Sequence, residues 1–361
     1  MKPKVALVLS GGVALGAYQA GAYAALHEHE SLRPESIAAS SVGAVNGALI
    51  AGNPPDQRLA RLQQFWEEAA VHTGWPLVDH WNALGRRLES ALGIMNARLF
   101  GRPGLFNPRI PTPHRLGLYD HEALGAKLQG LLDFDRLNAS DIGFTLVTTE
   151  VETGKKVVFD TQAGDRITPA HLLATCGFLP EFPPVEINGM LLGDGGLVAN
   201  TPVEEVLLAE QGNRDLVCFI IELFSAAGNR PRTLEQGTAR RWDLIFGTQT
   251  QRVLRALERE HIFRCALAAR EGKARLPSVT ILHLSYRAPT LEIGYDKMFN
   301  FSRATLRERW EAGYLDMLEA VHLSSGSAQN GSGPRGFTRT FWPGATPKRN
   351  LKLVLDNAAS R

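Results

Sequence analysis

Two segments near the start of the chain repeat one order of elements, and this order restricts the fold. Residues 5–9 (VALVL) form a continuous aliphatic run, which is typical of a strand buried on both faces. The run leads into Ser10-Gly11-Gly12 and then into small and apolar residues at helical spacing. Residues 36–51 (SIAASSVGAVNGALIA) repeat the order as a strand, a turn at Ser41 and a helix. Such alternation predicts an α/β fold in which right-handed crossovers join parallel strands.

The rest of the chain continues the alternation. Strands are predicted over 142–149, 156–159, 216–221 and 279–284, where β-branched and aliphatic residues gather. The Asn188-Gly189 dipeptide lies between two short apolar runs, a pattern that predicts a β-hairpin. Helices are predicted over 14–27, 53–70, 121–132, 233–269 and 300–321.

Composition limits the class of protein and its partners. The 361 residues are 44% hydrophobic, enough for one large core or two smaller ones. The formal net charge of +2 gives no indication of a nucleic-acid partner. The three cysteines, Cys176, Cys218 and Cys265, are widely separated, which argues against a disulfide framework or a zinc site.

Neither a signal peptide nor a membrane-spanning helix is expected. The N-terminal apolar run ends at Ser10 after five residues, too few for the core of a signal peptide. No run approaches the roughly 18 apolar residues that a membrane-spanning helix needs. We therefore expect a cytoplasmic protein, with peripheral contact at the inner membrane face as a further expectation.

The segment 78–113 combines apolar residues, arginines and several Gly and Pro breaks. We expect an irregular helical excursion that covers the C-terminal edge of the sheet. Lining an acyl pocket, or touching a lipid surface through Arg, Leu and Phe side chains, are the alternatives. We divide the chain into a catalytic core over 1–222, an extension packed on it over 223–323, and a flexible tail over 324–361, where Gly and Ser predominate at the start.

Three loops follow predicted strands: Gly11-Gly12, Ser41 and Asp194. In an open α/β sheet, ligands bind beyond the carboxyl ends of the strands, so these loops can face one crevice. Ser41 would be the nucleophile, on a sharp turn of the kind called a nucleophile elbow. Asp194 would accept its proton. The N–H groups of the loop Gly11, Gly12 and Val13, at a helix start, would bind the oxyanion.

The sequence resembles the patatin-like phospholipases. Members of that family share a G-G-G-x-K/R-G loop, a G-x-S-x-G elbow and a D-G-G/A motif in this order. Here the three motifs are 11–16 (GGVALG), 39–43 (ASSVG) and 194–196 (DGG). The flanking GAYQAG, GAVNGA and NTPV also look like the family, and the likeness covers roughly residues 4–222.

The resemblance implies a three-layer α/β/α fold with a mainly parallel sheet. It also implies hydrolysis of acyl esters of phospholipids, lysophospholipids or related lipids by a Ser41–Asp194 dyad, with no metal or cofactor.

Three residues depart from the family motifs. Val13 takes the place of the third glycine, which leaves a backbone N–H donor available if φ stays negative. Leu15 replaces the usual basic residue and is expected to weaken binding of an anionic head group. Ala39 replaces the first glycine of the elbow, a small steric change.

Several alternatives stay open from the sequence. The glycine loop superficially matches a dinucleotide-binding fingerprint, but Val13 breaks the G-x-G-x-x-G pattern. His171 could complete a Ser-His-Asp triad, although a lone helical histidine is more often structural. The chain could also be an inactive member of the fold that binds a membrane surface or a partner. Acyl transfer to an acceptor other than water would use the same dyad.

Overall fold

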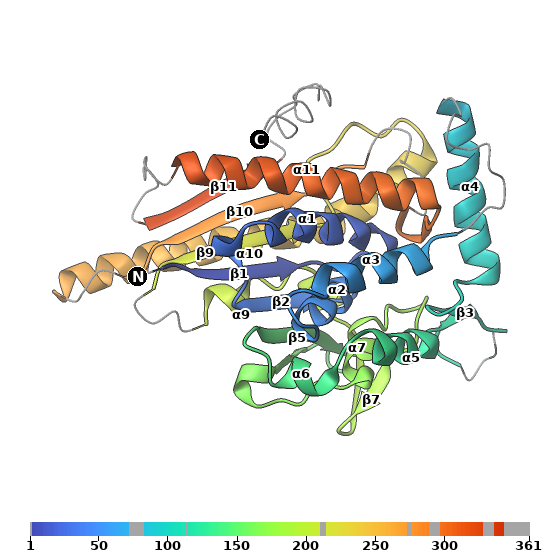
Figure 1. Cartoon of the computed structure of the whole chain (residues 1–361), viewed down its shortest axis with the longest axis horizontal. Helices are drawn as coiled ribbons and strands as arrows, with labels where there is room; N and C mark the ends of the chain where they lie inside the picture. The colour runs from blue at the N-terminus through green and yellow to red at the C-terminus, as the bar shows by residue number, and fades with distance from the viewer. Residues whose placement is uncertain are drawn as a thin grey trace.

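The computed structural model describes residues 2–71, 83–110, 112, 115–209, 214–272, 276–288, 297–327 and 336–342. Its centre is a nine-stranded sheet in the order β11-β10-β9-β1-β2-β5-β8-β7, with β6 paired to β5 (Figure 1). The neighbours from β11 to β5 are parallel, whereas β6, β7 and β8 pair antiparallel. The strands are β1 (Lys4–Leu9), β2 (Ser36–Ser40), β5 (Gly143–Glu150), β6 (Lys156–Asp160), β7 (Val185–Ile187), β8 (Met190–Asp194), β9 (Leu216–Glu222), β10 (Val279–Ser285) and β11 (Phe337–Trp342).

Helices cover both faces of the sheet, because the side chains of β1 are buried on both faces. Val5, Leu7 and Leu9 face the core shared with α1, α2, α3 and α11, whereas Ala6 and Val8 face the core shared with α9 and α10. The three-layer α/β/α prediction is thus confirmed. The helices are α1 (Ala17–His27), α2 (Val42–Ala51), α3 (Arg58–Ala69), α4 (Ala83–Phe100), α5 (Glu122–Leu131), α6 (Phe134–Asn138), α7 (Pro169–Thr175), α8 (Gly196–Ala199), α9 (Glu204–Leu207), α10 (Leu234–Arg270) and α11 (Arg303–Ser327).

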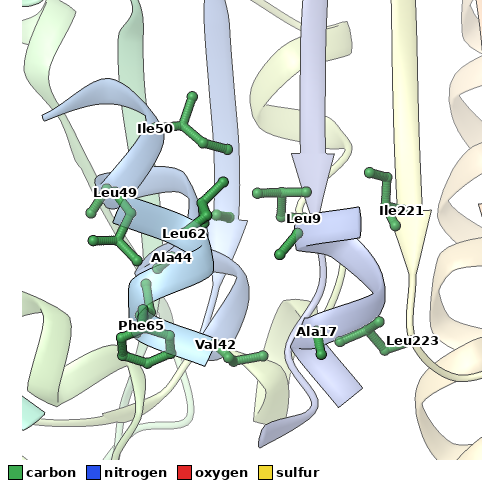
Figure 2. Close-up of a cluster of buried hydrophobic side chains, with 14 of the residues drawn as sticks. Leu9, Ala17, Val42, Ala44, Leu49, Ile50, Leu62, Phe65, Ile221 and Leu223 are labelled. Atoms are coloured by element: carbon green, nitrogen blue, oxygen red, sulfur yellow. The ribbon is translucent and has the colours of Figure 1, made fainter. Parts of the chain in front are cut away.

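The larger core joins α2 and α3, the two helices that follow β2, to the sheet. Figure 2 shows Val42, Leu49 and Ile50 of α2 beside Leu62 and Phe65 of α3, next to Leu9 and Ile221 at the ends of β1 and β9. Each of these side chains is almost wholly removed from water. Burying one such side chain stabilises the fold by about 1.5–3 kcal/mol. The same packing therefore fixes the carboxyl ends of β1 and β2 relative to each other.

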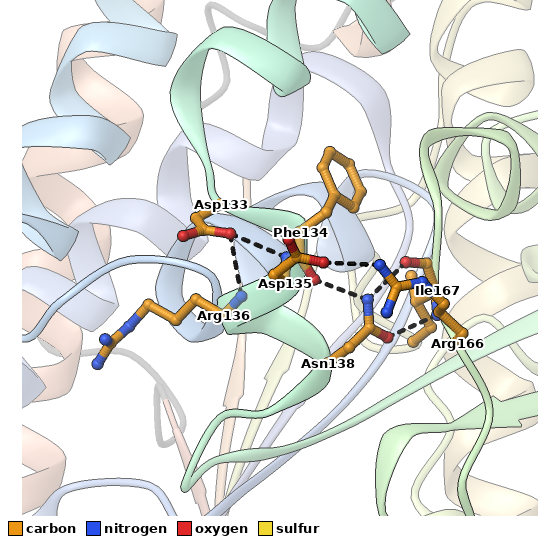
Figure 3. Close-up of polar contacts among 7 residues, drawn as sticks. All are labelled: Asp133, Phe134, Asp135, Arg136, Asn138, Arg166 and Ile167. Atoms are coloured by element: carbon orange, nitrogen blue, oxygen red, sulfur yellow. Dashed lines mark hydrogen bonds and ion pairs between the residues drawn. The ribbon is translucent and has the colours of Figure 1, made fainter.

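A polar junction connects α6 to the segment that enters α7. Asp133 caps α6 by accepting from the N–H groups of Asp135 and Arg136 (Figure 3). The Asn138 side chain accepts from Ile167 N at 2.7 Å and donates to Ile167 O at 2.8 Å. Because Ile167 directly precedes the cap of α7, this junction holds the start of a helix that ends beside Ser41.

The predicted elements are found, with differences at the C-terminus. The Asn188-Gly189 hairpin is present, with both residues at positive φ between β7 and β8. Within the predicted flexible tail, however, α11 continues to Ser327 and residues 337–342 form β11, parallel to β10. β10 would otherwise be the sheet edge, and an unpaired edge favours the addition of a strand. Residues 343–361 lie outside the described part, as do 72–82 at the start of the predicted excursion.

Within the described residues, no helix combines the length and the apolar character that crossing a membrane requires.

Glycines let α1 and α11 touch backbone to backbone. A β-carbon on Gly313 would lie 1.9 Å from Tyr18 O, and one on Gly21 would lie 1.9 Å from Trp310 O. We expect Gly313→Ala to lower the free energy of unfolding by about 1–3 kcal/mol, because the helices must separate. The matched control is Gly237→Ala in α10, where a β-carbon has no neighbour within 4 Å.

The Gly237→Ala control should be neutral, or should stabilise by up to about 1 kcal/mol through helix propensity. Urea unfolding of the two variants beside the wild type measures both effects. Equal stability of the Gly313→Ala and Gly237→Ala proteins would contradict the backbone contact between α1 and α11.

Candidate active site

Ser41 lies on a strained turn between β2 and α2. Its φ of 53° and ψ of −130° fall in a region that residues other than glycine rarely occupy. The Thr175 hydroxyl accepts from Ser41 N at 3.0 Å and donates to Val147 O of β5 at 2.6 Å. This bridge ties the turn to the neighbouring strand. The backbone therefore has the shape of a nucleophile elbow, in which the side chain stands above the sheet.

Small residues around Ser41 are a steric requirement. A β-carbon on Gly43 would lie 2.4 Å from Leu9 O, because the first turn of α2 packs directly on the end of β1. A β-carbon on Gly11 would lie 2.9 Å from the Ser41 Cβ and 3.6 Å from its Oγ. The glycine loop and the serine are therefore in contact, as the sequence predicts for loops that share one crevice.

The glycine loop differs from expectation at two residues. The Gly11 amide donates to Asn200 O at 3.1 Å, so this N–H is occupied and is not available to an oxyanion. Val13 has a φ of 50°, whereas a side chain at this position is expected to be tolerated only if φ is negative. A β-branched residue in this region is strained by about 1–3 kcal/mol. The third glycine of the family motif would relieve this strain.

Leu15, at the position of the basic residue of the family motif, is fully buried in the larger core. The substitution therefore replaces a charged side chain by a core residue, and Leu15 does not line the pocket described below.

A buried amide network holds the glycine loop against α2. Gln19 donates to Ser10 O at 2.8 Å, and Asn46 of α2 donates to Gln19 Oε1 and to Gly16 O, both at 3.0 Å. Trp66 of α3 donates to Asn46 Oδ1 at 3.0 Å. Because these groups are buried, losing one partner leaves an unsatisfied amide at a cost of about 1–3 kcal/mol. The network fixes where the loop sits beside Ser41.

Asp194 ends β8 and is 3% exposed. Its Oδ1 accepts from Gly196 N at 2.6 Å, and its own N–H donates to Gly177 O at 3.0 Å. Burial raises the pKa of this carboxyl to about 7, against the lowering effect of hydrogen bonds from the Ser41 side chain and the Gly196 amide. The carboxyl is therefore tuned to exchange a proton near neutral pH.

One pocket contains all three predicted loops. It is lined by Gly11, Gly12, Val13, Ser41 and Asp194 and encloses about 770 Å³ of empty space, its opening to solvent included. The remaining lining is mostly aromatic and aliphatic, in two walls. Phe178, Phe224 and Phe246 form one wall and Phe106, Phe182 and Phe301 the other.

Sequence reasoning missed several residues of the pocket. Asn200 is one: its carboxamide oxygen lies against both Gly11 and Gly196, so it joins the glycine loop to the Asp194 loop. His121 and Cys176 also line the pocket. Burial lowers the pKa of His121, and burial together with the Asp194 charge raises the pKa of Cys176, so both side chains are neutral. No motif marks these positions, because their place depends on tertiary packing.

His171 does not take part in the pocket. Its Nδ1 accepts from Thr168 N at 3.2 Å in the capping box of α7, and its ring packs edge-on against Phe159. The structural interpretation of this histidine therefore holds. Among the described residues, no three or more His, Cys, Asp or Glu side chains are arranged to hold a metal ion.

Comparisons with known proteins identify the family of the chain. A family model described as Patatin-like phospholipase matches residues 7–207, and one described as Patatin phospholipase matches residues 247–330. No curated protein sequence was found to match. The chain therefore belongs to the patatin-like phospholipase family, which makes it a lipid hydrolase at the level of the family.

Solved structures give distant matches. VipD from Legionella pneumophila is 12% identical with a TM-score of 0.39, over 90% of this chain and 67% of VipD. The type III effector ExoU is 14% identical with a TM-score of 0.35, over 89% of this chain. The matched region spans about half (53%) of the ExoU chain.

The pKa of Asp194 predicts how stability depends on pH. The folded state keeps the Asp194 proton up to about pH 7, whereas the unfolded chain releases it near the ordinary value of 3.8. The wild-type protein therefore loses stability as pH rises between these values. Asp194→Asn removes this loss. The unfolding free energy of the variant minus that of the wild type should therefore grow by roughly 2–3 kcal/mol from pH 5 to pH 7, at about 1.4 kcal/mol per pH unit.

Urea unfolding at a series of pH values measures that difference. Asp141→Asn, at an exposed carboxyl, is the matched control and should give a difference that does not change with pH. A pH-independent difference for Asp194→Asn as well would show that the buried carboxyl is ionised at no free-energy cost.

Proposed function

We propose that this protein is a lipid acyl hydrolase that cleaves a carboxylic ester of a phospholipid, lysophospholipid or related lipid through Ser41 and Asp194. The observation that supports this most is the meeting of a strained serine and a buried carboxyl of raised pKa at the inner end of an apolar pocket. An apolar pocket of this kind suits a fatty acyl chain, because the chain gains about 0.8 kcal/mol for each CH₂ group it buries.

The first step forms an acyl-enzyme. Ser41 Oγ attacks the ester carbonyl carbon while Asp194 accepts the hydroxyl proton. The negative charge that develops on the carbonyl oxygen is bound by the N–H groups of Gly12 and Val13, which begin a 3-10 helix and have no acceptor within it. When the carbon–oxygen bond to the alcohol breaks, Asp194 returns the proton to the leaving oxygen.

The second step releases the fatty acid. A water molecule loses its proton to Asp194 and attacks the acyl carbon, and the serine oxygen leaves and recovers that proton. A base with a pKa near 7 suits both steps, since it can take up and return the proton at neutral pH. The aromatic walls exclude bulk water, which strengthens the hydrogen bonds to the oxyanion.

Replacing Ser41 tests the nucleophile. We expect Ser41→Ala to lower kcat for p-nitrophenyl butyrate by at least about 1,000-fold, because among the described residues Ser41 is the only Ser, Thr or Tyr that lines the pocket. Ser40→Ala is the matched control. The Ser40 hydroxyl is buried beside Gly195 and makes no hydrogen bond within the described residues, so its removal should leave kcat near the wild-type value.

A fluorophosphonate probe distinguishes an active site from an inactive binding module. The wild type and Ser40→Ala should be labelled, and Ser41→Ala should not, since only an activated serine reacts. A wild-type protein that is neither labelled nor active would favour the binding module. Unchanged turnover in Ser41→Ala would exclude Ser41 as the nucleophile.

The pKa of Asp194 also predicts the pH dependence of the reaction. The carboxylate is the active form of the base, so kcat/KM should rise about tenfold per pH unit below about pH 7 and level off above it. Initial rates with p-nitrophenyl butyrate at constant ionic strength measure this profile. A flat profile from about pH 5 to pH 8 would show that a group other than Asp194 accepts the proton.

A further inference from the structure

α4 presents apolar side chains to solvent on the side away from the core. Its inner side carries Gly93 and Ala97, which are buried, and a β-carbon on Gly93 would lie 3.1 Å from Ser302 Cβ. On the outer side, Leu92, Met95 and Leu99 follow at helical spacing, and Phe100 ends the helix. Leu99 is 59% exposed and Phe100 68% exposed. A helix on the surface of a globular protein normally places polar side chains there.

The segment after α4 adds further exposed apolar side chains. Ile110 is 82% exposed, and Leu116 and Leu118 are also exposed. Together with the four side chains of α4 they form what we call the α4 patch. It contains half of the large hydrophobic side chains that are exposed among the described residues. Such a concentration marks an interaction surface, whereas single exposed apolar residues need no explanation.

The α4 patch shares structural elements with the wall of the pocket. The chain passes from Phe100 into Leu105 and Phe106, which line the pocket. The inner side of α4 contacts residues 300–302, where Phe301 also lines the pocket. In Figure 1, α4 stands at the end of the sheet toward which β1 points, the end that carries Ser41 and the glycine loop. The patch thus lies on the same side of the molecule as the pocket.

The charge of this region suits an anionic surface. Residues 83–118 contain six arginines and one acidic residue. Arg102 is buried and donates to Ala69 O and Ala70 O. Arg98 and Arg109 are partly exposed and face Glu181 and Asp120, so that among the described side chains of this region the exposed Arg115 is the arginine best placed to meet an anionic surface. An anionic lipid would therefore add to an attraction that comes mainly from the apolar side chains, as for amphipathic helices that lie in the membrane interface.

From the patch, its continuity with the pocket and its charge, we propose that the α4 patch docks on the surface of a bilayer that contains anionic lipid and brings the pocket to its substrate. This inference rests on the proposed hydrolase function for the meaning of the pocket. Docking itself needs no catalysis, so the two ideas can fail separately.

The test is binding to vesicles of phosphatidylcholine with about a third of phosphatidylglycerol. We expect Leu99→Ser/Phe100→Ser to weaken co-sedimentation by about tenfold or more, because two side chains no longer enter the interface. Its kcat/KM for soluble p-nitrophenyl butyrate should stay at the wild-type value, since neither residue lines the pocket. Turnover of lipid in the vesicles should fall with binding.

The matched control is Phe263→Ser/Leu267→Ser on α10. These two side chains are also exposed, at 73% and 56%, but lie on a different helix. The control should bind vesicles like the wild type. Ser41→Ala should also bind like the wild type, so that a catalytic failure of the proposed function is separated from a failure of docking. Pure phosphatidylcholine vesicles should bind the wild type more weakly.

Three results would overturn the proposal. The first is unchanged vesicle binding by Leu99→Ser/Phe100→Ser. The second is an equal or larger loss in the α10 control, which would place lipid contact elsewhere. The third is a wild-type dimer in sedimentation equilibrium that Leu99→Ser/Phe100→Ser converts to a monomer, which would make the α4 patch an interface between two copies of the chain.

Discussion

The strained turn at Ser41 is the constraint on which the site depends. Ser41 can hold a positive φ only while its neighbours enforce it. Thr175 accepts its N–H, the end of β1 packs against Gly43, and Gly11 lies against its side chain. Strain of about 1–3 kcal/mol is small beside the burial free energy of α1, α2 and the sheet. The packing of the core is therefore sufficient to hold the elbow in its strained conformation, with the serine side chain in the pocket.

The sequence predicts those features of the structure that depend on residues close together in the chain. Aliphatic runs, glycine turns and the Asn188-Gly189 hairpin appear as expected, and the three motif loops lie in one pocket. What depends on distant packing was not predictable. The positive φ at Val13 belongs to a loop that packs closely against Leu223 at Gly12, and no pattern around Val13 indicates that geometry. The β11 strand was missed because a Gly/Ser-rich segment precedes it and each of its residues pairs with a residue of β10 that lies 58 positions earlier.

The aromatic walls were missed for the same reason. Phe106, Phe178, Phe224 and Phe246 come from four separate stretches of the chain, and none of them belongs to a periodic pattern. Each is ordinary as a core residue and is notable only because it lines the same pocket as Ser41. In the proposed mechanism the motif residues perform the reaction, whereas the residues that would select the acyl chain carry no sequence motif.

Burial of Asp194 links the reactivity of the site to its apolar surroundings. The walls that would hold an acyl chain are the same walls that remove water from the carboxyl and raise its pKa. In the proposed mechanism, an acyl chain that fills the pocket would displace the remaining water and raise that pKa further, which would make the Asp194 carboxylate a stronger base for the Ser41 proton. Binding and proton transfer would then be coupled through desolvation, and a polar substitution in either aromatic wall would weaken both together.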